Sequence, residues 1–254
     1  MPEERSTGWG VAIHGGAGAI PADIPPARRE ACIISLTAIL EHGAQLLSRG
    51  SHALDVVEEL VIRLENEPLF NAGRGAVFTS AGEHELEAAI MDGSTLDCGA
   101  VAGIRTVRNP IRLARCVMQQ TKHIMLAGAG AEEYAESIGL ERVEPSWFDT
   151  DHRRAELERY TEAPALLEQE GSTVGAVVRD SAGRLAAATS TGGMTGKMPG
   201  RIGDTPLVGC GTYADGGCAV SCTGHGESFV RHVAAHEVAV LARSSGRGAK
   251  GAVE

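Results

Sequence analysis

The sequence predicts a single α+β domain in which pairs of strands alternate with amphipathic helices. The chain has 254 residues, of which 43% are hydrophobic, so it can bury one core of ordinary size. Two strand-like runs flank a turn at residues 92–94, and two more flank a turn at residues 180–183. Strands joined by such short turns pair in the antiparallel sense, which favours the α+β class.

The N-terminal half begins with a strand and two helices. Residues 9–13 have the character of a strand, and His14 with the glycines after it indicates a tight turn. Pro25 and Pro26 favour a helix start, and Gly50 favours its end. The elements expected next are a helix over 53–66, strands over 86–104, a helix over 110–120, a short strand over 123–127 and a helix over 131–138.

The rest of the chain is organised around one glycine-rich hairpin, residues 171–204, which read GSTVGAVVRDSAGRLAAATSTGGMTGKMPGRIGD. Its first strand is small, β-branched and apolar, as in a strand that is buried on both faces. A hairpin places the start of its first strand beside the end of its second, so Thr173 and Thr191 are expected at the same end of the sheet. Arg201 and Asp204 follow in a loop. Beyond it, we expect strands over 207–213 and 218–223 and an amphipathic helix over 227–243.

The segment before this hairpin, residues 149–171, is rich in charge and poor in apolar residues. Such a composition is typical of a solvated surface helix or a mobile linker. A strand that begins at a cut in the chain needs the preceding segment to be free to leave. We therefore expect the join between two pieces of a cleaved chain to lie at the end of this segment.

Two features of the hairpin suggest chemistry. A threonine hydroxyl is a weak nucleophile unless a base lies beside it, and the α-amine of an N-terminal threonine is one such base. For Thr173, this requires a cut just before it. Arg201 and Asp204 offer sites for a carboxylate and an ammonium group, the two charges of an α-amino acid. From these residues alone, a hairpin with a polar turn and a surface ion pair is the simpler interpretation.

Five stretches of the chain carry a family resemblance. They are VAIHGGAGAI, LENEPLFNAGRGAVF, LEAAIMDGSTLDCGAVAGI, TVGAVVRDSAGRLAAATSTGGMTGKMPGRIGDTPLVGCGTYAD and AVSCTGHGES, in that order. Together they resemble the plant-type asparaginase and isoaspartyl aminopeptidase family of N-terminal-nucleophile hydrolases. The resemblance implies a four-layer αββα sandwich in one domain, cut into an α-subunit, residues 1–172, and a β-subunit, residues 173–254. It also implies a homodimer of these αβ protomers.

The resemblance assigns the catalytic roles one residue at a time. Thr173 is the expected nucleophile, with its own amine as base after autocleavage. Thr191 is expected to hydrogen-bond the nucleophile's oxygen and to help cut the precursor. Thr223 and the N–H of Gly224 form the expected oxyanion hole. Asn71 is expected beside the nucleophile, where it helps to orient it, although an asparagine before Ala-Gly is also a common turn residue.

The resemblance also implies how substrate is held and what the reaction is. Arg201 is expected to bind the α-carboxylate, and Asp204 to bind the α-ammonium with the carbonyl of Gly226, while Thr223 and Gly224 contact the reacting group. The implied reaction is hydrolysis of L-asparagine or of β-aspartyl dipeptides through an acyl-enzyme. Two alternatives stay open: a glycosylasparaginase-like hydrolase, and an uncleaved, inactive scaffold that binds amino acids.

The chain departs from the family pattern in two places. Ser172 precedes the nucleophile, where the family's asparaginases usually have glycine, and serine restricts the backbone more. Aspartylglucosaminidase and threonine aspartase have aspartate there, so a residue other than glycine is compatible with cleavage. The family's chains also continue after the helix at 227–243 with another helix and two strands, so we expect the β-subunit to be short and the final strands to be missing.

Catalysis in the resembled family needs no cofactor, but a structural sodium ion is implied. A hard cation prefers oxygen ligands, and in the family a loop wraps the ion mainly with main-chain oxygens. The corresponding residues are Leu64, Glu65, Glu67, Phe70, Ala72 and Arg74. Main-chain ligands leave no mark on residue type, so the sequence itself adds little to this expectation.

Charge and cysteine content limit the expected binding partners and cellular location of the protein. The chain has 23 Lys and Arg against 33 Asp and Glu, a net charge of −10, which disfavours nucleic acid and anionic membranes as partners. We find no apolar core of a signal peptide in residues 1–10 and expect no membrane span. Six scattered cysteines without a CxxC pattern indicate reduced thiols. We therefore expect a cytoplasmic protein that acts on a small molecule.

Overall fold

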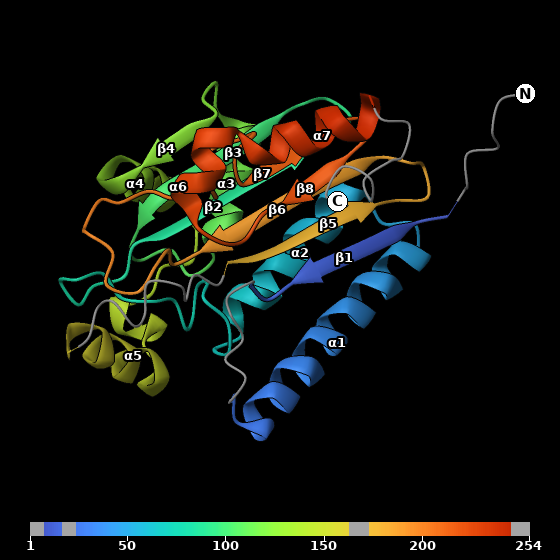
Figure 1. Ribbon diagram of the computed structural model, residues 1–254. Helices are drawn as coiled ribbons and strands as arrows, with labels where there is room; N and C mark the ends of the chain where they lie inside the picture. The colour runs from blue at the N-terminus through green and yellow to red at the C-terminus, as the bar shows by residue number, and fades with distance from the viewer. Residues whose placement is uncertain (1–7, 17–23, 163–172, 245–254) are drawn as a thin grey trace, which may run out of the picture.

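The computed structural model describes residues 8–16, 24–162 and 173–244. Its architecture is mixed α/β and is built on a six-stranded sheet with the strand order β1-β5-β6-β2-β3-β4 (Figure 1). The strands are β1 Gly10–His14, β2 Leu86–Asp92, β3 Cys98–Ile104, β4 Met125–Ala127, β5 Val174–Arg179, β6 Leu185–Thr191, β7 Thr212–Ala214 and β8 Ala219–Ser221. The helices are α1 Pro26–Ser48, α2 Ala53–Asn66, α3 Pro110–Gln120, α4 Gly128–Ser137, α5 Asp151–Glu162, α6 Gly226–His232 and α7 Ala234–Ser244, with a 3-10 turn at Pro145–Phe148.

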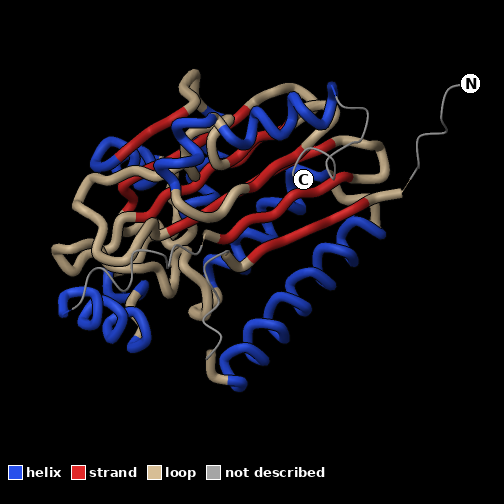
Figure 2. The backbone as a smooth tube through the Cα atoms, in the orientation of Figure 1, coloured by secondary structure: helices blue, strands red, loops and turns tan. Residues whose placement is uncertain are grey.

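The hairpin of β5 and β6 lies inside the large sheet. β5 pairs antiparallel with β1 and β6, and β6 pairs antiparallel with β2, so strands far apart in the sequence lie side by side (Figure 2). Only the β3–β4 pair among the described strands is parallel. The start of β5 and the end of β6 therefore meet at one end of the sheet, as the sequence predicts for Thr173 and Thr191.

The main core lies between this sheet and helices α1, α2 and α3. α2 packs on β5 and β6, α3 packs on β2 and β3, and α1 packs on β1 and α2. The apolar residues predicted to face inward from α2 are all buried: Leu54, Val57, Leu60, Val61 and Leu64. Each side chain of this size contributes about 1.5 to 3 kcal/mol by leaving water, so α2 is a main anchor of the two central strands.

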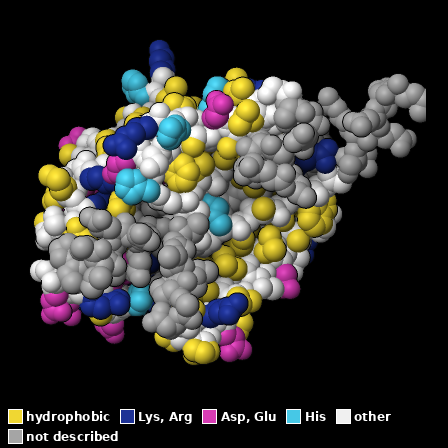
Figure 3. All heavy atoms as spheres, viewed as in Figure 1, with side chains coloured by type: hydrophobic (Ala, Val, Ile, Leu, Met, Phe, Trp, Pro, Cys, Tyr) yellow, Lys and Arg dark blue, Asp and Glu magenta, His cyan; other side chains and the backbone are white. Residues whose placement is uncertain are grey.

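A second, two-stranded sheet lies on the other side of the large one. Its strands, β7 and β8, contact β6, and α7 packs on both of them. A small cluster around Met91, Ala187 and Ala214 fills the space between the two sheets. In Figure 3, hydrophobic side chains are visible along the part of the surface where Figure 1 draws β1 and β5.

Two of the expected elements are wrong in the C-terminal part. The strand expected over 207–213 is a series of turns up to Thr212, because the backbone N–H of Cys210 bonds to the carbonyl of Leu207 and Gly209 has φ of +92°. The single helix expected over 227–243 is two helices. Val233 lies between them in the left-handed conformation, and the N–H of His236 donates to the carbonyl of Gly209.

The expectation of no membrane-span candidate is also wrong for α1. An 18-residue window of this helix reaches a mean hydropathy of 1.3, so α1 is long and apolar enough to cross a membrane by length and composition alone. Apolar residues occupy both of its faces: Ile39 and Leu47 are buried, whereas Ile33 and Ile34 are exposed.

The charged segment before the hairpin begins with a helix, α5. Arg153 is buried in it, donating to the carbonyl of Gly75 at 2.8 Å and to Glu156 at 2.5 Å. The expectation of a surface helix is therefore only partly right, because a buried ion pair fixes one face of α5. The expected join between the two pieces, with Ser172, lies outside the described residues.

Candidate active site

Thr173 lies immediately before β5, and Thr191 is the last residue of β6. Both are buried, and the Thr173 hydroxyl donates to Thr191 Oγ1 at 3.1 Å. The register explains this contact, because Val174 pairs with Ser190 and the next pair outward is Thr173 with Thr191. The backbone N–H of Gly193 also donates to Thr191 Oγ1 at 2.9 Å, which fixes the acceptor beside the proposed nucleophile.

Thr223 follows β8 and reaches Thr173 from the small sheet. Its Oγ1 accepts from the backbone N–H of Thr173 at 3.2 Å. The next residue, Gly224, has φ of +148°, and a Cβ there would lie 3.0 Å from the Phe229 ring. The glycine therefore permits a backbone path that a larger residue would strain. Thr173, Thr191 and Thr223 thus come from three segments and meet at one end of the sheets.

Asn71 does not contact Thr173 directly in any hydrogen bond among the described residues. Its amide donates to the carbonyl of Gly193 at 2.7 Å, and its Oδ1 accepts from the N–H of Val77 at 2.9 Å. Gly193 in turn donates to Thr191, so Asn71 is connected to Thr191 through the Gly192–Gly193 turn. If Asn71 helps to orient the nucleophile, as the sequence predicts, it does so indirectly through Gly193 and Thr191.

Arg201 is held by Glu227, which the sequence reasoning did not consider. The guanidinium donates through Nε to Oε1 and through Nη2 to Oε2, both at 3.0 Å. This two-point geometry is the one an arginine offers to any carboxylate. The Arg201 contact lowers the pKa of Glu227 to about 2. Glu227 is the second residue of α6, and its proximity to Arg201 could not be read from sequence spacing.

Asp204 is buried beside this pair and lacks a complete set of partners. Its Oδ2 is fully shielded, and no group among the described residues hydrogen-bonds to it. Burial raises the pKa of the Asp204 carboxyl to about 6. A buried carboxylate oxygen without a partner is costly, so this site is suited to a cationic group that arrives with a ligand.

Gly226 brings the backbone against both charged groups. A Cβ on this residue would lie 2.8 Å from Arg201 Nη2 and 2.9 Å from Asp204 Oδ1. Only glycine fits this close approach without displacing one of them. The structure therefore brings Arg201, Asp204 and Gly226 together. Their roles in binding a substrate stay a prediction.

Two buried acids support the loop that carries Arg201 and Asp204. Glu87 accepts from the N–H of Gly203 at 3.0 Å and from Lys197 Nζ at 3.3 Å. Glu85 accepts from the N–H of Gly200 at 2.7 Å. Glu87 belongs to β2 and Glu85 directly precedes it, so the large sheet holds the loop in place. The sequence offered no local sign of these pairings, because more than a hundred residues separate the partners.

The expected sodium loop begins within α2 rather than after it. The helix runs to Asn66, so Leu64 and Glu65 are helical, while Glu67, Phe70, Ala72 and Arg74 follow it. Carbonyl oxygens crowd two glycines there. A Cβ on Gly73 would lie 2.4 Å from the oxygen of Glu65, and a Cβ on Gly75 would lie 2.5 Å from the oxygen of Pro68 and 2.9 Å from that of Phe70. Backbone oxygens suit a hard cation. Three of the expected ligand carbonyls also accept backbone hydrogen bonds: Leu64 from Glu67 at 3.3 Å, Glu67 from Phe70 at 3.3 Å and Glu65 from Arg74 at 2.7 Å.

The side chain of Glu65 has a structural role that the sequence reasoning missed. It is fully buried and accepts from Ser190 Oγ at 2.7 Å, Asn109 Nδ2 at 3.0 Å and the N–H of Ile111 at 3.0 Å. Burial raises the pKa of Glu65 to about 8, while its three donors favour the charged form. The carboxyl thus ties α2 to the start of α3 and to the residue before Thr191.

We expect Glu65→Ala to lower the free energy of unfolding by about 3 kcal/mol, because three buried donors lose their acceptor. Chemical denaturation at neutral pH measures this change. Glu41→Ala, on the exposed side of α1, is the matched control and should change stability by less than about 0.5 kcal/mol. Equal stability of the two variants would contradict the role assigned to Glu65.

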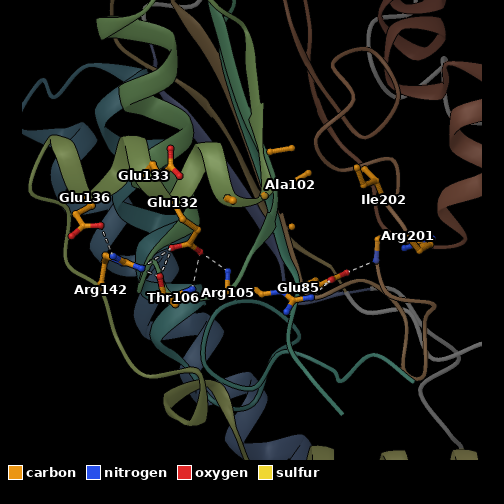
Figure 4. Close-up of a pocket in the computed structure, with 15 residues that line it drawn as sticks. Glu85, Ala102, Arg105, Thr106, Glu132, Glu133, Glu136, Arg142, Arg201 and Ile202 are labelled. Atoms are coloured by element: carbon orange, nitrogen blue, oxygen red, sulfur yellow. Dashed lines mark hydrogen bonds and ion pairs between the residues drawn. The ribbon is translucent and has the colours of Figure 1, made fainter. Parts of the chain in front are cut away.

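A separate cavity of about 670 Å³ lies beside the Arg201 loop. Figure 4 shows Arg201 and Ile202 on one side of it and Thr106, Glu132 and Arg142 on the other. The polar groups opposite Arg201 pair with one another, as when Glu132 accepts from the N–H of Thr106 at 2.9 Å. Thr173, Thr191 and Thr223 are not among the residues that line this cavity.

The fold and the site together define a mixed α/β protein with a buried threonine cluster beside a pair of opposite charges. Comparison with known proteins identifies the family. A family model described as asparaginase matches residues 7–254. The chain therefore belongs to the asparaginase family.

Three curated relatives show how far the similarity extends. An isoaspartyl peptidase of Escherichia coli is 51% identical over 243 residues, covering 91% of this chain and 76% of the relative. An isoaspartyl peptidase of Salmonella typhimurium is 49% identical over 248 residues, covering 93% and 79%. A probable isoaspartyl peptidase/L-asparaginase of Arabidopsis thaliana is 42% identical over 275 residues, covering 97% and 84%. The family resemblance seen in the sequence is thus confirmed.

Proposed function

We propose that this protein is an autocleaving threonine amidohydrolase that acts on L-asparagine and β-aspartyl dipeptides. The observation that carries the proposal is the meeting of Thr173, Thr191 and Thr223 from three separate segments, with the Thr173 hydroxyl 3.1 Å from Thr191 Oγ1. The names of the relatives support the same activity. In this proposal, Thr173 Oγ1 first attacks the carbonyl carbon of Ser172, and the peptide bond between Ser172 and Thr173 becomes an ester. Water then hydrolyses the ester, which leaves a carboxylate on Ser172 and a free amine on Thr173.

The proposed reaction then proceeds through an acyl-enzyme. The Thr173 amine takes the proton of its own hydroxyl, and Oγ1 attacks the side-chain carbonyl carbon of the substrate. The negative charge that develops on the carbonyl oxygen is stabilised by the Thr223 hydroxyl and the N–H of Gly224, a contribution typically worth about 3 kcal/mol per donor. Ammonia or an amino acid leaves with the proton, and water then hydrolyses the ester.

The charged groups beside the threonines would position the substrate. Arg201 takes the α-carboxylate, and the partnerless Oδ2 of Asp204 takes the α-ammonium, helped by the carbonyl of Gly226. Binding both charges at fixed points places the side-chain carbonyl near Thr173 and lowers the entropy cost of the attack. The buried carboxylate of Asp204 explains why a ligand with an amine is favoured.

The test combines two measurements on the purified protein. Intact mass under denaturing conditions, after long incubation, should give two fragments, residues 1–172 and 173–254. The same sample should release ammonia from L-asparagine and aspartate from a β-aspartyl dipeptide. A single uncut mass together with absence of turnover would contradict the proposal. Turnover of a glycosylasparagine alone would instead support the glycosylasparaginase alternative.

The pH dependence of this activity follows from two groups that must lose a proton. The free Thr173 amine acts as base when neutral, and an α-amine normally titrates near pH 8. Asp204, whose pKa burial raises to about 6, binds an ammonium group only when it is ionised. Both groups are protonated as the pH falls, so kcat/KM should decline tenfold per pH unit below pH 7 and more steeply below pH 6.

A pH profile of kcat/KM and kcat from pH 4.5 to 9 checks this expectation. The steeper limb belongs to substrate binding, so it should be present in kcat/KM and weaker in kcat, where the bound ammonium keeps Asp204 ionised. A kcat/KM profile with a slope of one throughout the acid range would exclude titration of Asp204 from the free enzyme.

Further parts of the proposal concern the assembled protein. We propose a four-layer αββα arrangement in a single domain, with an α-subunit before Thr173 and a β-subunit after it; the packing of α7 on the small sheet supports it. A structural sodium at the loop after α2 is supported by the backbone oxygens of Pro68 and Phe70, which lie 2.5 and 2.9 Å from the Cβ position of Gly75.

A homodimer is supported by the exposed Ile33 and Ile34 of α1. Sedimentation equilibrium and sodium-dependent thermal stability test these points.

A reducing location is consistent with the thiols. All six cysteines are unpaired: Cys32, Cys98, Cys116, Cys210, Cys218 and Cys222. Free thiols persist best where the surroundings are reducing, which supports a cytoplasmic protein. Fractionation of the native source tests this location.

A further inference from the structure

One row of residues crosses three neighbouring strands just below the threonine cluster. His14 of β1 pairs in register with Gly175 of β5, and Gly175 pairs with Thr189 of β6. Cross-strand neighbours on one face of a sheet have side chains within contact distance. Gly175 in the middle of the row has no side chain, which leaves a gap between His14 and Thr189.

Ser221 of the small sheet fills this gap. Its Oγ lies 2.8 Å from His14 Nε2 and 2.8 Å from Thr189 Oγ1. A Cβ on Gly175 would overlap Ser221 Oγ and lie 2.6 Å from His14 Nε2, so only glycine allows the serine to enter. The hydrogen bonds therefore join β1, β6 and β8 through a space that β5 leaves open.

The end of this chain of hydrogen bonds is the proposed nucleophile. His14 Nδ1 lies 2.9 Å from the carbonyl oxygen of Thr173. A carbonyl can only accept, so Nδ1 must carry the proton. Burial lowers the pKa of His14 to about 4, so at neutral pH the imidazole has one proton and Nε2 is an acceptor. Ser221 must then donate to Nε2, and Thr189 must donate to Ser221.

Each member of the cluster above lies two residues from this row. Thr173 precedes Gly175 by two, Thr191 follows Thr189 by two, and Thr223 follows Ser221 by two. Residues i and i+2 of a strand face the same way, so the row lies directly beneath the site in β5 and β6. A residue of the row that moves would therefore be expected to move the member of the threonine cluster two residues away on the same segment.

We propose that His14, Ser221 and Thr189 form a positioning row, in which His14 holds the carbonyl of Thr173 and thereby aligns its amine and hydroxyl with Thr191 and Thr223. The inference rests on the proposed function, because it concerns the alignment of that nucleophile. His14 is a positioning residue, since it touches the backbone of Thr173 and not the substrate. The sequence analysis placed His14 only in a tight turn.

Two substitutions of His14 separate its two contacts. In His14→Asn the side-chain amide can replace Nδ1 and still donate to the Thr173 carbonyl, whereas in His14→Gln it reaches towards Ser221 instead. If the contact with Thr173 is the functional one, kcat per cleaved chain should fall less than about threefold in His14→Asn and about tenfold or more in His14→Gln. KM should change by less than about twofold in both, because Arg201 and Asp204 are untouched.

Glutamine is closer to histidine in size, so a role in filling space alone predicts the opposite order. Activity of His14→Gln equal to or above that of His14→Asn would overturn the proposal. Ser221→Ala removes the donor to Nε2 with little change in volume and should also lower kcat about tenfold. His123→Asn and His123→Gln, at an exposed turn, are the matched controls and should keep the unmodified rate.

A measurement that needs no turnover tests the row independently. In the ¹⁵N-labelled unmodified protein at pH 7, the imidazole nitrogen shifts of His14 should show a protonated Nδ1 and a bare Nε2. A protonated Nε2 at that pH would overturn the proposal. The tautomer can be read whether or not the chain hydrolyses asparagine, so failure of the row and failure of the proposed function are distinguishable.

Discussion

Thr173→Ala is expected to leave the chain uncut and to reduce hydrolysis of L-asparagine by at least about 10⁴-fold. The substitution removes the hydroxyl that attacks both the preceding peptide bond and the substrate, and without the cut no α-amine exists to serve as base. The effect should be of the size seen when a nucleophile is removed from other hydrolases. Intact mass and ammonia release from the same sample measure both losses.

Thr173→Ser is the matched control, because it keeps the hydroxyl within reach of Thr191 Oγ1. This variant should still be cut and should retain measurable hydrolysis. Loss of the methyl group alone changes packing in a buried site and is expected to cost less than about tenfold in kcat. Hydrolysis that survives in Thr173→Ala at the unmodified rate would exclude Thr173 as the nucleophile.

Much of the fold could be predicted because its signals are local. Apolar residues at helical spacing gave α2 its observed bounds, 53–66, and Pro110 gave α3 its observed start. The turns at 92–94 and 180–183 placed both hairpins of the large sheet. Hairpin geometry also placed Thr173 beside Thr191, because that contact needs only the register of two adjacent strands.

Other features depend on partners that no local pattern reveals. The break at Val233 reflects α7 docking on the loop that carries Gly209, and the same docking replaces the expected strand by turns. Glu227 reaches Arg201 across 26 residues and Ser221 reaches His14 across 207, so neither pairing leaves a periodic trace. The role of Thr223 came only from the family resemblance, because its contact with Thr173 joins two different sheets.

The second large effect is expected for Arg201→Gln. The guanidinium is the group proposed to bind the substrate's α-carboxylate, and its loss also removes both hydrogen bonds that it donates to Glu227. The Glu227 carboxylate, no longer neutralised by Arg201, would then repel the substrate carboxylate. Each hydrogen bond to a charged group contributes about 1.5 to 3 kcal/mol, and the guanidinium can offer two of them to the substrate carboxylate. The value of kcat/KM should therefore fall at least about a hundredfold, mainly through KM. Steady-state kinetics with L-asparagine measure this.

The double variant Arg201→Gln with Glu227→Gln separates the two causes of that loss. If repulsion by Glu227 contributes, removing its charge should restore kcat/KM about tenfold relative to Arg201→Gln alone. Equal losses in the single and double variants would show that only the missing guanidinium matters. Arg63→Gln is the control, since Arg63 forms a similar contact with Glu59 at 2.9 Å on the exposed surface of α2. It should leave KM unchanged, which would tie the effect of Arg201 to its place beside Asp204 and Gly226.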